Sequence, residues 1–114
     1  TVGFIVRDAE TAVLYSGDTR ETHRIWEAGR RERRLKAAFI ETSFPNELSE
    51  LAKTSGHLTP EMFGREWPKL GRPDIPIYIY HRKPPYRELI SEELKRLKLP
   101  NINILEEGQR IRIG

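Results

Sequence analysis

Three ionisable side chains stand where apolar runs of the sequence end. Asp18 leaves the run VLYSG, Glu41 ends KAAFI, and His81 follows IPIYIY. A fourth candidate, His57, lies between two helical segments and is preceded by a glycine, which lets the backbone turn. In open α/β sheets, sites form in the crevice outside the carboxyl ends of the strands. Carboxylates and imidazoles gathered there suit a divalent metal such as zinc, manganese or iron, or acid–base chemistry.

Each of these residues also has an ordinary structural explanation. Asp18 could cap the helix that follows it. Glu41 could be a solvent-exposed carboxylate, and a single histidine at a strand end is often hydrogen-bonded at the surface or in the core. A third histidine, His23, falls on an amphipathic helix, where we expect a surface position. Residue type and spacing alone leave both interpretations open.

The elements that would position these side chains alternate between strands and helices. The apolar runs predict strands over residues 3–8, 13–16, 35–41 and 75–80, and helices over 46–56, from 60 onward, and 86–97. The first two strands are predicted to form a hairpin, and residues 102–114 a second one. The alternation favours an α/β fold with a mixed sheet.

Several details of these elements can also be predicted. Thr19 or Thr22 can cap a helix that carries Ile25, Trp26 and Ala28. In the later helices, one face should bury Leu48, Leu51 and Ala52, and another should bury Phe63, Trp67 and Leu70, with Pro60 at the first position and Pro68 ending or kinking the helix. The strand over 35–41 is apolar on both faces, which predicts helices on both sides of the sheet.

Composition narrows the classes of protein. The chain has 114 residues, 37% of them hydrophobic and 32% charged, which favours a polar globular domain or part of one. The absence of cysteine excludes disulfides and thiolate metal sites, and it fits a reducing compartment such as the cytoplasm. No run approaches the roughly 20 apolar residues that a membrane span needs. The first residue is threonine, so we expect a processed or trimmed product or a fragment.

A basic stretch lies between the first two candidate site residues. Residues 20–36 contain seven cations and three glutamates, although the net charge of the whole chain is only +3. Such a cluster can attract phosphate groups. It can equally be a solvated helix end, where cations are favourable near the carboxyl terminus of the helix.

Four motifs together resemble a known family. SGDT, FIETSFPNEL, SGHLTPE and IPIYIYHRKP occur in this order and resemble the C-terminal half of the metallo-β-lactamase fold, most closely the class II cyclic-nucleotide phosphodiesterases. The resemblance implies that residues 1–114 form half of an αββα sandwich. The metal-binding motif HxHxDH of the family does not occur in the chain. The resemblance therefore implies an N-terminal half that this chain lacks.

The resemblance also implies roles for individual residues. Asp18 resembles the aspartate that bridges two metal ions, and His81 resembles the last histidine ligand of one of them. His57 resembles a histidine that faces the scissile phosphate, so that His57 and Thr19 are the candidate substrate-binding residues. Glu41 would orient His57, as the glutamate of an HEAT motif does in the related tRNA-processing endonucleases, although this chain has isoleucine in place of that motif's histidine.

The expected activity is hydrolysis of 3′,5′-cyclic nucleotides, cAMP or cGMP, at two divalent metal ions, with zinc preferred over manganese or iron. Two ligands, Asp18 and His81, make an incomplete site, so this chain alone is expected to be inactive. The expected partners are the phosphodiester substrate and the missing N-terminal half or a second chain, with homo-oligomerisation as a further expectation. A ribonuclease Z-like RNA-processing endonuclease and a non-catalytic α/β interaction module are the alternatives.

Overall fold

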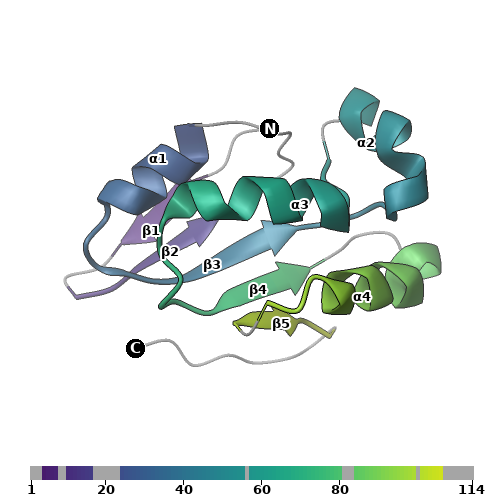
Figure 1. The fold of residues 1–114 in the computed structure, drawn as a ribbon. Coiled ribbons are helices and arrows are strands. Elements are labelled where there is room, and N and C mark those ends of the chain that lie inside the picture. The colour runs from purple at the N-terminus through teal and green to yellow at the C-terminus, as the bar shows by residue number, and fades with distance from the viewer. Residues whose placement is uncertain are drawn as a thin grey trace.

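A computed structural model describes residues 4–7, 10–16, 24–55, 57–80, 84–99 and 101–106 of the chain. Within these ranges the chain is an α/β protein with one five-stranded sheet and four helices (Figure 1). The strands are β1 (Phe4–Arg7), β2 (Ala12–Tyr15), β3 (Leu35–Glu41), β4 (Ile77–Tyr80) and β5 (Ile102–Ile104). The helices are α1 (Arg24–Arg31), α2 (Ser49–Ser55), α3 (Pro60–Glu66) and α4 (Arg87–Arg96), with 3₁₀ turns η1 (Asn46–Leu48), η2 (Trp67–Leu70) and η3 (Pro84–Tyr86).

The sheet is mixed, as the alternation of elements predicts. Its strand order is β1-β2-β3-β4-β5, with β1 antiparallel to β2 and the other three pairs parallel. The predicted N-terminal hairpin is confirmed. Because β2, β3 and β4 run in the same direction, their carboxyl ends meet at one edge of the sheet, as a site between them requires.

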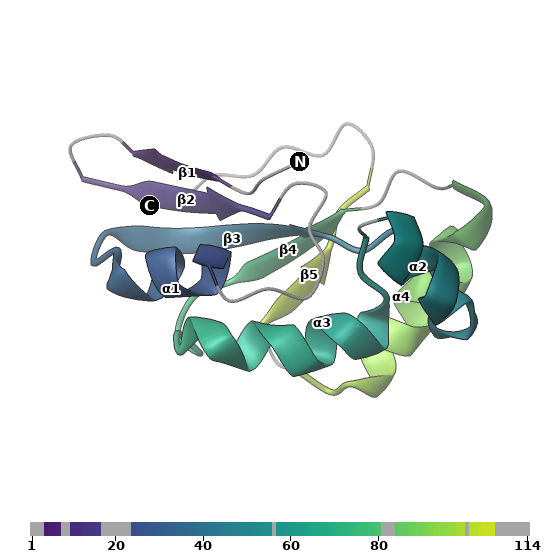
Figure 2. The same ribbon diagram turned by 90° about the horizontal axis from the view of Figure 1, so that it is seen from above.

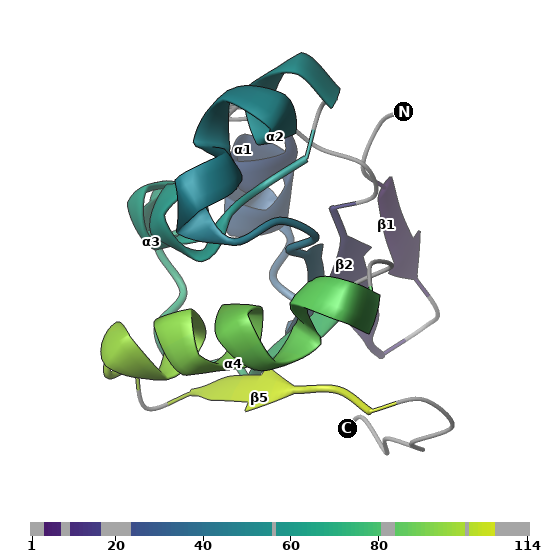
Figure 3. The same cartoon turned by 90° about the vertical axis from the view of Figure 1, so that its right-hand side faces the viewer.

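All four described helices lie on the same face of the sheet (Figures 2 and 3). Leu14, Ala38 and Ile77, which are neighbours across three strands, point into the core beneath them. The prediction of helices on both sides is therefore wrong for the part of the chain that the structure describes. On the opposite face, the rings of Tyr15 and Phe39 stack with centroids 5.0 Å apart, and Phe39 stacks on Tyr78 at 5.1 Å.

Helix α1 packs closely on the sheet through a glycine. A Cβ atom at the buried Gly29 would lie 2.6 Å from the Cδ1 atoms of both Leu14 and Leu70. Of the three apolar residues named for this helix, Ile25 and Trp26 are buried and Ala28 is exposed. Gly29 makes the close contact instead, and a side chain at this position would force Leu14 and Leu70 to shift. The cap expected at Thr19 or Thr22 falls outside the described residues.

The central helices follow the predicted signals except at one position. Thr59 caps α3, accepting a hydrogen bond from the Met62 backbone N–H at 3.2 Å, and α3 ends at Glu66, two residues before Pro68. Leu51 is 46% exposed rather than buried with Ala52. The segment divides into η1 and a separate seven-residue α2, so the predicted apolar face does not continue along one helix.

The C-terminal helix and strand agree in part with the elements predicted from the sequence. Ile90 and Leu94 of α4 are buried at helical spacing, as predicted. Strand β5 pairs in parallel with β4, and the returning arm of the predicted final hairpin, residues 107–114, lies outside the described ranges. Among the described helices, none has the length and apolar character needed to cross a membrane.

Candidate functional site

Glu41 and His57 meet at the carboxyl edge of the sheet. Glu41 is the last residue of β3 and is buried, and His57 lies in the segment between α2 and α3. The Nδ1 atom of His57 is hydrogen-bonded to Oε1 of Glu41, although 16 residues separate them in sequence. The fold therefore brings together the two residues that were predicted to carry out acid–base chemistry.

Two serines that were not among the predicted site residues make hydrogen bonds to Glu41. The Ser43 hydroxyl donates to Oε1 of Glu41 at 2.9 Å, and the Ser16 hydroxyl oxygen accepts from the Glu41 backbone N–H at 3.0 Å. Ser16 also donates its backbone N–H to the Phe39 carbonyl at 2.9 Å, which joins the end of β2 to β3. In the sequence, the one sign that these serines belong to the site is that they lie within the motifs SGDT and FIETSF.

His57 is fixed through its backbone and through its ring. Its N–H donates to the Ala52 carbonyl at 2.9 Å, and the next carbonyl, that of Leu58, accepts from the Ser43 N–H at 3.2 Å. The ring of Phe44 lies edge-on to the imidazole, with centroids 5.6 Å apart and an interplanar angle of 63°. The imidazole is thus oriented on two sides, and 16% of its side chain stays accessible to solvent.

This arrangement defines what His57 can do chemically. When Glu41 is ionised its carboxylate only accepts hydrogen bonds, and Nδ1 then carries the hydrogen that meets Glu41. The other nitrogen, Nε2, is then free to accept a proton, and to donate it once the ring is charged. A carboxylate behind an imidazole is the arrangement that sets tautomer and orientation in acid–base catalysis.

The other predicted site residues, Asp18, Thr19 and His81, lie outside the described residues, as does His23. The strand ends that precede them are described and lie beside Glu41. The Thr42 N–H donates to the Tyr80 carbonyl at 2.9 Å, and this bond joins the ends of β3 and β4. Among the described residues, no three histidines, aspartates or glutamates are grouped so that they could hold a metal ion.

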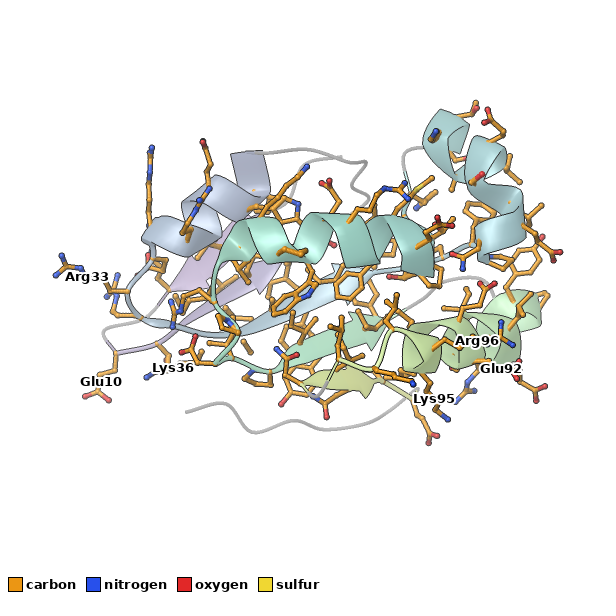
Figure 4. The ribbon with its side chains drawn as sticks, viewed as in Figure 1. Glu10, Arg33, Lys36, Glu92, Lys95 and Arg96 are labelled. Atoms are coloured by element: carbon orange, nitrogen blue, oxygen red, sulfur yellow. The ribbon has the colours of Figure 1, made fainter. Side chains whose placement is uncertain are left out.

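Two cations of the basic stretch lie at the opposite end of the sheet from Glu41. Arg33 and Lys36 project where the chain leaves α1 and enters β3 (Figure 4). Strand β3 has seven residues, so this end lies about 20 Å from Glu41. Arg33 and Lys36 therefore do not reach the Glu41–His57 pair.

A glutamate at this end is held between arginines of two segments. Glu32 Oε2 accepts from Arg7 of β1 at 2.5 Å, and Oε1 accepts from Arg34 at 3.3 Å. The Arg7 hydrogen bond, with Arg34 in support, holds the pKa of the Glu32 carboxyl below its ordinary value of 4.5. The carboxylate thereby ties the edge strand to the α1–β3 turn.

A pH-dependent contribution to stability follows from the lowered pKa of Glu32. The carboxylate should stabilise the fold fully above about pH 4.5, and this contribution should disappear as the pH falls through the lower folded-state pKa. Glu32→Gln should therefore reduce the urea midpoint at pH 7 and leave it almost unchanged near pH 2. Glu27→Gln on the exposed surface of α1 is the control. Equal losses at both pH values would contradict the assignment.

Comparison of the chain with protein-family models, with curated proteins and with solved structures finds no match in any of the three.

Proposed function

We propose that this chain is the C-terminal half of a metallo-β-lactamase-like domain and contributes to a two-metal site that hydrolyses 3′,5′-cyclic nucleotides. The observation that carries the proposal is the Glu41–His57 hydrogen bond at the carboxyl edge of parallel strands. This contact is the acid–base pair that the family resemblance implies, and its partners lie on separate segments. The absence of cysteine supports a cytoplasmic location as part of the same proposal.

Each site residue has a role in this proposal. Asp18 and His81 would hold the metal ions. Asp18 comes shortly after β2 and His81 directly after β4, and the ends of both strands lie beside Glu41. Bound divalent ions supply hydroxide near neutral pH and polarise phosphoryl oxygens. His57 donates a proton from Nε2 to the departing ribose oxygen, or neutralises charge on the phosphate, while Glu41 stabilises the charged ring. Thr19, beside Asp18, would bind the phosphate.

The sheet face opposite the helices supports the half-domain part of the proposal. In a sandwich of two sheets, each sheet receives helices on one face and its partner sheet on the other. The stacked rings of Tyr15, Phe39 and Tyr78 form an aromatic row on the face that carries no described helix. We propose that the other half of the domain, from a preceding segment or a second chain, packs on this row.

The ribonuclease Z-like alternative gains no support from the cations at the start of β3. Arg33 and Lys36 lie about 20 Å along the strand from Glu41, so they do not line the proposed site. A small cyclic substrate needs only the strand-end residues and His57. The cyclic-nucleotide assignment therefore remains the first choice.

Zinc titration and a hydrolysis assay test the proposal together. In a calorimetric titration, this chain alone should bind zinc weakly, because only Asp18 and His81 are proposed to coordinate the metal directly. Combined with a half that carries HxHxDH, it should bind two metal ions and hydrolyse cAMP or cGMP. Asp18→Ala and His81→Ala should lower the metal content, whereas His23→Ala should not.

Two outcomes would contradict this proposal. Tight, stoichiometric zinc binding by a monomer of this chain would contradict the count of two ligands. A fully metallated complex that leaves both cyclic nucleotides intact would overturn the assigned reaction.

A further inference from the structure

Ser43 makes one hydrogen bond to Glu41 and another to Leu58, the residue that follows His57 in the chain. Its hydroxyl donates to Oε1 of Glu41 at 2.9 Å, the same oxygen that accepts from His57. Its backbone N–H donates at 3.2 Å to the carbonyl of Leu58, the residue after His57. Ser43 is fully buried, so neither bond competes with bulk water.

The Ser43 hydroxyl adds a hydrogen bond that restricts the orientation of the Glu41 carboxylate. A glutamate has three side-chain torsions, and its terminal torsion is broad, so a single hydrogen bond does not fix the carboxylate plane. A second donor to Oε1 restricts that plane and keeps this oxygen directed at Nδ1. Oε1 acts as an acceptor toward both partners, because two hydrogens already point at it.

We infer that Ser43 is a positioning residue that acts through Glu41, forming with it and His57 a hydrogen-bonded triad. Ser43 holds the carboxylate in the orientation that selects the Nδ1–H tautomer of His57. Nε2 is thereby kept as the nitrogen that exchanges a proton. The geometric part of this inference stands on the described contacts alone, and its catalytic consequence rests on the proposed function.

The neighbouring Thr42 provides a matched control. Thr42 is also fully buried, and its side-chain oxygen has no hydrogen-bond partner among the described residues. Thr42→Val removes a hydroxyl from the adjacent position and keeps the branched shape of the side chain. It should leave the tautomer of His57 unchanged, whereas Ser43→Ala removes a hydroxyl of the triad.

The tautomer can be measured directly on this chain. Nitrogen-15 chemical shifts of the imidazoles report which ring nitrogen carries hydrogen, and the three histidines can be assigned with His23→Asn and His81→Asn. At one fixed alkaline pH, Ser43→Ala should lower the Nδ1–H to Nε2–H ratio of His57 by about threefold or more. Ser43→Thr, which keeps the hydroxyl, should preserve the ratio, as should Thr42→Val.

Three results would overturn the inference: an unchanged ratio in Ser43→Ala, an equal change in Thr42→Val, or an equal change in Ser43→Thr. The last two would show that packing, and not the hydroxyl, sets the tautomer. In the assembled two-metal protein, Ser43→Ala should lower kcat about tenfold with KM unchanged, as is typical of groups that orient a site residue. A changed tautomer in an assembled protein that hydrolyses no cyclic nucleotide would refute the proposed function and leave the triad standing.

Discussion

Trp26→Ala should destabilise the fold by about 3–5 kcal/mol, the usual range for a large buried aromatic side chain. Trp26 is fully buried on α1, where its ring fills the space between this helix and the core. Its indole N–H donates to Oε1 of the buried Glu66 on α3 at 3.0 Å, and Lys69 Nζ lies 2.5 Å from the other carboxylate oxygen. The substitution removes apolar packing and one donor to a buried charge.

Two further variants separate these contributions. Trp26→Phe keeps most of the ring volume but removes the N–H donor, and we expect a loss of about 1–3 kcal/mol, the cost of removing one partner from a buried polar group. Trp67→Ala on η2 is the matched control, because this second tryptophan is only partly buried. Urea unfolding followed by circular dichroism measures all three. A loss in Trp67→Ala as large as that in Trp26→Ala would contradict the assigned packing.

The sequence predicted the elements whose signals are local. The strand over 35–41 matches β3 residue for residue, because a continuous apolar run this short fits a buried strand better than a helix. Thr59 followed by Pro60 predicted the start of α3, since the cap and the proline act within one turn of the helix. These features depend on neighbours that the sequence itself lists side by side.

The sequence could not predict the features set by contacts between distant segments. The role of Gly29 depends on Leu14 and Leu70, which approach it from β2 and η2. The one-sided helix layer follows from how the helices pack, because an apolar residue on the second face of β3 can also join an aromatic row such as that of Phe39.

In the candidate site, too, the local features could be predicted from the sequence and the contacts between distant segments could not. The position of Glu41 after a buried strand was visible in the sequence, but its contact with His57 came from the family resemblance and not from spacing. The contribution of Ser43 was not visible, because a serine near a strand end is an ordinary loop residue until its partner is known. Residues that work through other residues leave the weakest sequence signal.

Under the proposed function, His57→Ala should lower kcat for cyclic-nucleotide hydrolysis about 10²–10⁴-fold in a two-metal complex of the two halves, the usual contribution of a positioned general acid or base. The metal content, measured by elemental analysis, should stay at the wild-type value. The Nδ1 atom of His57 is hydrogen-bonded to Glu41, and in the described part of the chain His57 belongs to no group of side chains that could hold a metal ion. KM should change little, since the proton moves only as the bond breaks.

Glu41→Gln is the informative companion to His57→Ala. The amide keeps the size of the carboxylate and one oxygen that can accept from Nδ1, but it carries no charge to stabilise the protonated ring. We therefore expect a smaller loss of kcat than in His57→Ala, and almost no further loss when both substitutions are combined, because the two residues act as one unit. Additive losses would show that Glu41 and His57 act separately. Loss of metal from His57→Ala would make His57 a ligand, and a different mechanism would then be required.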